Sequence, residues 1–158
     1  MKILDSALFD SLSAEATQSP RLRKNFNLHS NYDEPCQRML NAIEPGSYVR
    51  PHRHSVTRKP ECCISLRGKM AVLTFDDCGQ IIGVYVFGGD GNLAGLDIPP
   101  DTWHTIISLE EGALFFEAKP GPYVPPASEE MAPWAPAEGS PESVPYLSLL
   151  TQIALDGR

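Results

Sequence analysis

Turn-forming residues interrupt this sequence at intervals of roughly 8–12 residues between positions 44 and 112, which leaves room only for short regular elements. Clusters of glycine, proline and aspartate, such as Pro99-Pro100-Asp101, favour tight turns. The segments between them are mostly apolar or alternating, and none is long enough for the helix of a βαβ crossover. The predicted strands are 21–29, 37–43, 48–54, 62–66, 70–75, 81–87, 93–98, 105–108 and 113–118. This pattern predicts an all-β sandwich or barrel.

The two ends of the chain differ from the middle. Apolar residues at helical spacing predict a short helix over 3–18, which Pro20 would end. Eight of the fifteen prolines lie between Pro120 and Pro145, so this stretch is expected to be extended chain packed on the barrel, followed by a short helix over 146–155. We predict one domain, 1–158, with an N-terminal helical segment (1–20), a β-barrel (21–119) and a Pro-rich C-terminal extension (120–158).

Composition excludes several classes of partner. The net charge is -7, and nucleic acids and anionic membranes both favour clustered Lys and Arg, so neither is an expected partner. The first 18 residues contain no apolar run as long as a signal peptide core, and no later run approaches the length of a membrane span. The four cysteines form no C-x-x-C pair, and we interpret them as reduced thiols of a cytoplasmic protein.

Three of the four histidines fall in two short motifs that predict a metal site. His52 and His54 are two residues apart, so in a strand both would face the same volume, and Glu61 on the next strand would add a carboxylate. His104, in Pro99-x-Asp101-x-x-His104, would complete the set. We expect one divalent transition metal, Zn, Fe, Mn or Ni, with a coordination position left open for chemistry.

Polar residues on the predicted strands are candidates for binding and catalysis. Arginine offers paired donors to anions, and asparagine offers a donor and an acceptor to hydroxyls. The candidate substrate-binding residues are Arg23, Asn25, Asn27, Arg38, Tyr48 and Arg50. The candidate catalytic residues are Glu117, Lys119 and His29, as proton carriers and an electrostatic stabiliser. The alternatives are a solvated outer face for the first strand and a structural ion pair for Glu117 and Lys119.

These motifs resemble the cupin superfamily, whose first motif pairs H-x-H with a downstream Glu and whose second motif adds a third histidine after a Pro-containing turn. The gap from His54 to Glu61 is longer here. The stretches 21–29, 37–42, 48–54, 117–123 and 131–136 look like the WbuC family of cupin fold metalloproteins. That resemblance implies a jelly-roll (double-stranded β-helix) barrel, a homodimer, and a setting in bacterial surface-polysaccharide metabolism.

Three functions remain open from the sequence. The first is a metal-dependent isomerase or epimerase acting on a sugar or nucleotide sugar, with the metal as a Lewis acid. The second is an Fe(II)-dependent dioxygenase. The third is a non-catalytic protein whose metal orients a small ligand. In each case the expected partner is a polar, carbohydrate-like small molecule.

Overall fold

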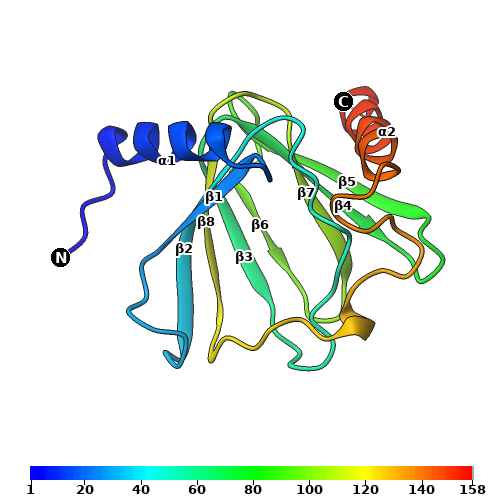
Figure 1. Ribbon diagram of the computed structural model, residues 1–158, viewed down its shortest axis with the longest axis horizontal. Helices are drawn as coiled ribbons and strands as arrows, with labels where there is room; N and C mark the ends of the chain where they lie inside the picture. Colours follow the sequence, from blue (N-terminus) through cyan, green and yellow to red (C-terminus); the bar gives the residue numbers. More distant parts are fainter. Residues whose placement is uncertain (158) are drawn as a thin grey trace.

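Eight strands form two antiparallel sheets within residues 1–157, the part of the chain that the computed structural model describes (Figure 1). The strands are β1 (Arg23–Asn27), β2 (Cys36–Ile43), β3 (Glu61–Arg67), β4 (Lys69–Phe75), β5 (Ile81–Gly88), β6 (Gly95–Ile98), β7 (Trp103–Ser108) and β8 (Ala113–Pro120). The larger sheet has the order β1-β2-β8-β3-β6 and the smaller the order β5-β4-β7. The two sheets face each other as an open barrel, and the predicted fold class is confirmed.

Helix α1 (Ser6–Gln18) covers the outer face of the larger sheet. It begins at Asp5, whose side chain accepts a hydrogen bond from the amide of Leu8 and so caps the first turn. Leu12 and Ala16 of the helix pack against Leu40 and other outward-facing residues of β2 and β8. The residues between these on β2 and β8 point to the inner face of the sheet, which α1 therefore does not cover.

Helix α2 (Ser143–Asp156) covers the outer face of the smaller sheet. Its buried residues Leu147 and Leu150 pack against Leu73 and Phe75 of β4. The helix begins three residues earlier than predicted and includes Pro145. Proline is tolerated there because the first turn of a helix does not use its backbone N–H groups for intrahelical bonds.

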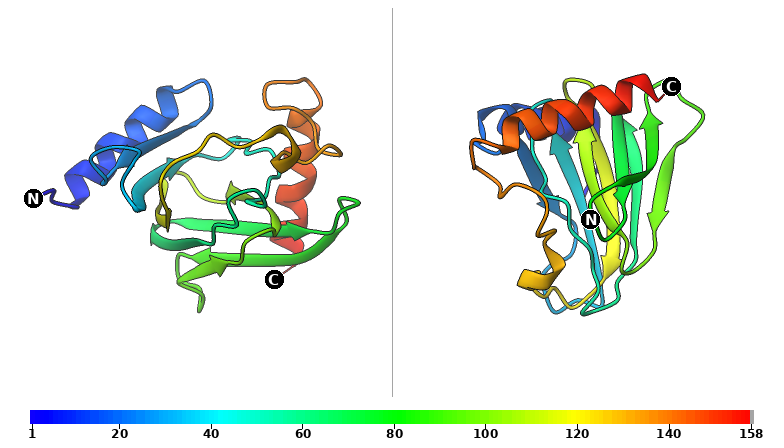
Figure 2. Two further views of the ribbon diagram at one scale, coloured as in Figure 1. Left: turned by 90° about the horizontal axis from the view of Figure 1, so that it is seen from below. Right: turned by 90° about the vertical axis from the view of Figure 1, so that its right-hand side faces the viewer.

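The chain between β8 and α2 crosses the open end of the barrel (Figure 1, yellow to orange, and Figure 2). It includes one short 3-10 helix, η1 (Ser128–Glu130). We call residues 121–142 the tail. Its extended path agrees with the prediction made from its prolines.

The predicted strand over 48–54 is wrong. This segment is irregular, and only His52 takes part in β-bridges, one to His104 of β7 and one to Met131 of the tail. The tail thus occupies the place that a neighbouring strand would take. No helix among residues 1–157 is long and apolar enough to cross a membrane.

Candidate metal centre and cavity

His52 and His104 lie side by side because their backbones pair directly. The amide of each donates to the carbonyl oxygen of the other, over 2.9 Å in both directions. Residues paired in this way in antiparallel chains project their side chains to the same face. The two imidazole rings accordingly have centroids 4.5 Å apart.

Glu61, the first residue of β3, brings a carboxylate to the same point. Its Oε1 lies 2.9 Å from Nε2 of His54, and its Oε2 lies 3.1 Å from Nε2 of His104. One ligand atom from each of His52, His54, Glu61 and His104 lies within 4.8 Å of all the others. Bond lengths of about 2.0–2.2 Å place the ligand atoms of one ion roughly 3–4.4 Å apart, so this set needs little adjustment to hold one. The longer gap before Glu61 does not remove it from the cluster.

The proton positions on two of the rings point to a cation between the side chains. Nδ1 of His52 lies 3.1 Å from the carbonyl oxygen of Arg50, and Nδ1 of His104 lies 2.8 Å from that of Thr102. A carbonyl oxygen only accepts, so both Nδ1 atoms carry the proton and a neutral ring keeps its lone pair on Nε2. Nε2 of His104 then faces a carboxylate oxygen of Glu61, an acceptor facing an acceptor, which a metal ion between them would stabilise.

Electrostatics hold these groups in their metal-binding forms. Burial, with a contribution from the charge of nearby His104, lowers the pKa of His52 to about 3. Burial alone would raise the pKa of Glu61, but its close contacts with the rings of His104 and His54 and the charge of Lys119 hold it well below its usual range. Nε2 of His54 is buried and makes no hydrogen bond of good geometry within residues 1–157. A neutral imidazole of His52 and an ionised carboxylate of Glu61 support a divalent transition metal, without selecting Zn, Fe, Mn or Ni.

The tail positions the segment that carries His52 and His54. The amide of Arg53 donates to the carbonyl oxygen of Glu130 over 2.9 Å, and the amide of Ala132 donates to that of Pro51 over 2.9 Å. The buried carboxylate of Glu130 accepts hydrogen bonds from the amides of Val56 (2.9 Å) and Ala127 (3.0 Å). Glu130 therefore joins the ligand-bearing segment to the tail through both its backbone and its side chain.

Replacing Glu130 with glutamine is expected to weaken metal binding roughly 10- to 100-fold, the range found for groups that orient metal ligands. The amide group of glutamine has only one acceptor atom, so one of the two hydrogen bonds to Val56 and Ala127 is lost. Competition with a chromophoric chelator measures the affinity. The matched control is Glu129→Gln, the exposed neighbour, which should bind metal like the wild type. Equal affinities in both variants would contradict a positioning role for Glu130.

Lys119 links Glu61, a candidate metal ligand, to a second carboxylate that is mostly buried. Its Nζ lies 2.7 Å from Oε1 of Glu61 and 2.7 Å from Oε1 of Glu117. Glu117 in turn accepts a hydrogen bond from the side-chain amide of Asn41 over 2.9 Å. Burial and the charge of Glu61 raise the pKa of Glu117, although Lys119 and Asn41 partly offset this. Burial alone would lower the pKa of Lys119, but the two carboxylates raise it by more than burial lowers it. The pKa therefore lies above its usual value, and the amine stays charged.

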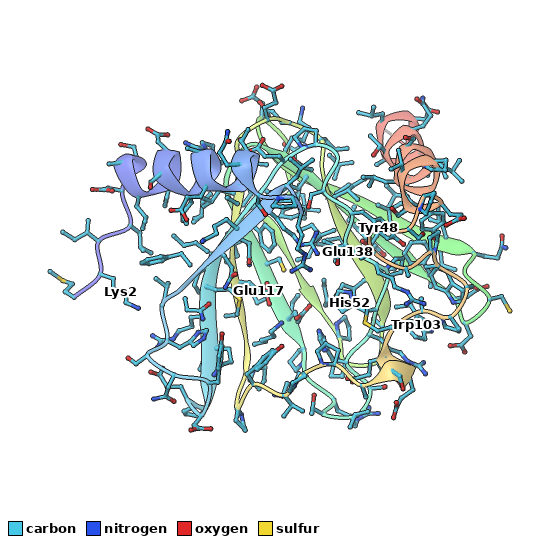
Figure 3. The ribbon with its side chains drawn as sticks, in the orientation of Figure 1. Lys2, Tyr48, His52, Trp103, Glu117 and Glu138 are labelled. Carbon is cyan, nitrogen blue, oxygen red and sulfur yellow. The ribbon has the colours of Figure 1, made fainter. Side chains whose placement is uncertain are left out.

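One cavity of about 270 Å³ lies between the two sheets, and its lining includes His52, Glu61, His104, Glu117 and Lys119. Figure 3 shows His52 and Glu117 in this space. Of the predicted substrate-binding residues, Arg23 and Asn25 line the cavity. Their strand, β1, therefore turns its polar face inward, as one of the two readings of the sequence expected.

The structure places the other predicted residues elsewhere. His29 lies beyond the end of β1, with Nδ1 2.9 Å from the carbonyl oxygen of Arg38, away from the cavity. The Arg38 side chain forms a surface ion pair with Glu34. Tyr48 donates its hydroxyl to the carbonyl oxygen of Pro136, Arg50 donates to that of Ala132, and Asn27 accepts from Asn25. Asn27, Arg38, Tyr48 and Arg50 are absent from the cavity lining, contrary to the prediction.

Sequence reasoning missed two residues of the site, Asn41 and Glu130. Asn41 lines the cavity. It lies two residues from both Met39 and Ile43, which face the cavity as well, and this spacing is a signal that could have identified it. Cys63 also lines the cavity, and burial together with Glu117 and Glu61 raises the pKa of its thiol, so it stays protonated. No local pattern indicates that Glu130 holds the ligand-bearing segment, because its partner there, Val56, is 74 positions away in the sequence.

Comparison with known proteins agrees with this architecture. Residues 4–87 match the family described as a domain of unknown function, DUF6016. No curated protein matches the chain. Among solved structures, KdgF from Halomonas sp. has a TM-score of 0.51 at 15% sequence identity, over 67% of this chain and 84% of that one.

Two further solved structures are less similar. The cupin domain of Cnp3 from Schizosaccharomyces pombe has a TM-score of 0.46 at 14% identity, over 62% of this chain and 64% of that one. Oxalate decarboxylase from Bacillus subtilis, a protein with Mn(II) centres, has a TM-score of 0.48 at 18% identity, over 70% of this chain and 27% of that one. The chain has the cupin fold.

Proposed function

We propose that this chain, which belongs to the DUF6016 family, is a metal-dependent cupin enzyme that transfers a proton on a polar, carbohydrate-like substrate, as isomerases and epimerases do. One observation carries the proposal: Lys119 joins a metal ligand, Glu61, to a second buried carboxylate, Glu117, inside one cavity. A metal that served only structure would not need this additional pair of charges. Buried charges are costly, and at functional sites they are retained for their chemistry.

The residues of the cavity suit a proton transfer between neighbouring carbon atoms. A bound divalent ion would polarise a substrate carbonyl or hydroxyl oxygen as a Lewis acid. The carboxylate of Glu117 would take a proton from the carbon atom next to the one that bears this oxygen. In an isomerisation the proton would return to the neighbouring carbon, and in an epimerisation to the opposite face of the same carbon, so no oxidant is needed. Asn41 fixes the orientation of Glu117, and the ammonium group of Lys119 would offset negative charge that develops on the substrate.

The proposal extends to the setting of the protein. Residues shared with the WbuC family support a place in bacterial surface-polysaccharide metabolism, a sugar or nucleotide-sugar substrate, a cytoplasmic location and a homodimer. The inward-facing Arg23 and Asn25 support a hydrophilic substrate, because they offer donors and an acceptor for hydroxyl groups. Light scattering measures the oligomeric state directly.

Solvent hydrogen exchange tests the proposed reaction. Protein loaded in turn with Zn, Mn, Ni or Fe(II) is incubated in D2O with a panel of aldoses, ketoses and nucleotide sugars, and proton NMR follows loss of signal at carbon. We expect metal-dependent exchange on at least one substrate, reduced about a hundredfold or more in Glu117→Gln, the range attributed to general base catalysis. Glu117→Gln should keep its metal, because Glu117 is not among the cluster of ligand atoms.

Other outcomes would replace the proposal. Oxygen uptake by the Fe(II) form, without exchange, would assign the chain to the dioxygenase class. Ligand binding with neither exchange nor oxygen uptake would assign it to the non-catalytic binding proteins. Exchange that survives intact in Glu117→Gln would keep the enzyme class and remove Glu117 from its assigned role.

A further inference from the structure

A pair of arginines at the edge of the cavity holds an internal carboxylate. Arg21 binds both oxygens of Glu138 through Nε (2.6 Å) and Nη2 (3.0 Å), and Nη2 of Arg23 contacts Oε1 over 2.8 Å. Both arginines line the same cavity as His52, Glu61 and His104, whereas Glu138 comes from the tail. A bidentate guanidinium–carboxylate contact is geometrically specific, so the shape and charge of this site suit a carboxylate.

The backbone between the two arginines is fixed in a conformation that costs energy. Leu22 has φ +53°, in the left-handed region that residues with a side chain rarely occupy. Two backbone hydrogen bonds hold it there, from the amide of Leu22 to the carbonyl oxygen of Ser19 and from the amide of Glu44 to that of Leu22, each over 2.9 Å. Strain of this kind is retained at ligand-binding positions, where it presets the geometry of a site.

Glu138 is held less firmly than Arg23, whereas the side chain of Arg21 is itself exposed. It lies on an exposed turn, closed by a bond of 3.1 Å from the amide of Ser140 to the carbonyl oxygen of Ala137. The next residue, Gly139, has φ +81°, and a side chain there would meet nothing within 4 Å. Arg23, by contrast, also donates to the carbonyl oxygen of Tyr48 (3.0 Å) and is mostly buried. The carboxylate can therefore leave while the arginine keeps its place.

We propose that Arg21 and Arg23 form a carboxylate-binding subsite of the cavity, that Glu138 occupies it when no ligand is present, and that an acidic, polyhydroxylated ligand of the sugar-acid class displaces Glu138. The carboxylate of the ligand would lie on the arginines and its hydroxyl groups would extend toward Asn25 and the metal ligands. The sugar part of this assignment rests on the proposed function, but the carboxylate subsite does not. Glu138 acts as an internal competitor, and its departure frees the tail turn above the cavity.

Binding of glucuronate and of glucose to metal-free protein tests the subsite, with isothermal titration calorimetry as the measurement. The chelator is dialysed out beforehand, so neither metal nor chelator competes for the carboxylate. The full-length wild type is compared with Glu138→Ala and with Glu138→Gln, which keeps the size of the side chain. The matched control is Glu34→Ala, which frees Arg38 of its partner on the surface, away from the cavity.

We expect Glu138→Ala to bind glucuronate about tenfold or more tightly than the wild type, because the internal competitor is gone, with Glu138→Gln between them. The Glu138 variants should bind glucose with the same affinity as the wild type. The Glu34→Ala control should bind glucuronate with the same affinity as the wild type. Adding Arg21→Ala to Glu138→Ala should remove the gain. Equal glucuronate affinity in the wild type and both Glu138 variants, with only a lower melting temperature, would overturn the subsite and leave Glu138 as a tether. Since no metal is present, this result is independent of whether the metal chemistry is correct.

Discussion

His104→Ala is expected to abolish binding of a divalent metal at one ion per chain. The substitution removes one of four ligand atoms, and it also removes the ring that packs against His52 at 4.5 Å. A ligand that binds only the native state stabilises it by about 2.7 kcal/mol at a concentration of 100 times its dissociation constant. The wild type should show this gain in unfolding experiments with added metal, and His104→Ala should not.

The matched control for this experiment is His29→Ala. His29 is also a buried histidine, but its Nδ1 bonds to the backbone of Arg38 and it lies outside the cavity. Elemental analysis of protein purified without chelators should find metal in the wild type and in His29→Ala, and none in His104→Ala. A wild type that neither carries metal nor takes up Zn, Mn, Ni or Fe would sink the metal-site interpretation.

Lys119→Met should destabilise the metal-free protein by about 3–5 kcal/mol, the range for breaking a buried ion pair by removing one partner. Without the ammonium group, the buried carboxylates of Glu61 and Glu117 lose their shared counter-ion at 2.7 Å. Denaturant unfolding monitored by circular dichroism measures the change. Methionine keeps the length of the side chain, so lost packing contributes little.

A second substitution separates lost charge pairing from damaged packing. In Lys119→Met/Glu117→Gln one of the two carboxylates is neutral, and the hydrogen bond with Asn41 can be kept. This double variant should recover part of the stability, because only Glu61 is then left without a cation. If the double variant is as unstable as the sum of the two single variants, electrostatics is not the cause of the loss.

The strands that pair with their neighbours along the whole length were predictable from local pattern. The predicted strands 37–43 and 70–75 agree with β2 and β4 to within a residue, because each is a short run rich in apolar residues between turn-forming residues. The segment 48–54 pairs with β7 only at His52, which is too little to make it a strand. Its backbone bonds to tail residues about eighty positions later, and no local pattern carries that information.

The clustering of the four candidate metal ligands could be predicted and much of the rest of the site could not, for a related reason. Spacing and residue type identified His52, His54, Glu61 and His104. The direction of a side chain beyond the end of a strand cannot be predicted in this way, because the alternation of the strand no longer applies. His29 was assigned by continuing an alternation that stops at Asn27, the last residue of β1. Arg38 has the parity of Leu40, which faces α1 and not the cavity.

The pairing of Pro51 and Arg53 with the tail has a consequence for the order of folding. During synthesis, the segment that bears His52 and His54 cannot reach its final position until Glu130 and Ala132 have left the ribosome, after every strand has been made. Contacts this distant in sequence form late, because closing the long loop between them costs entropy. Metal uptake by the nascent chain would therefore report that both sheets and the tail have already come together.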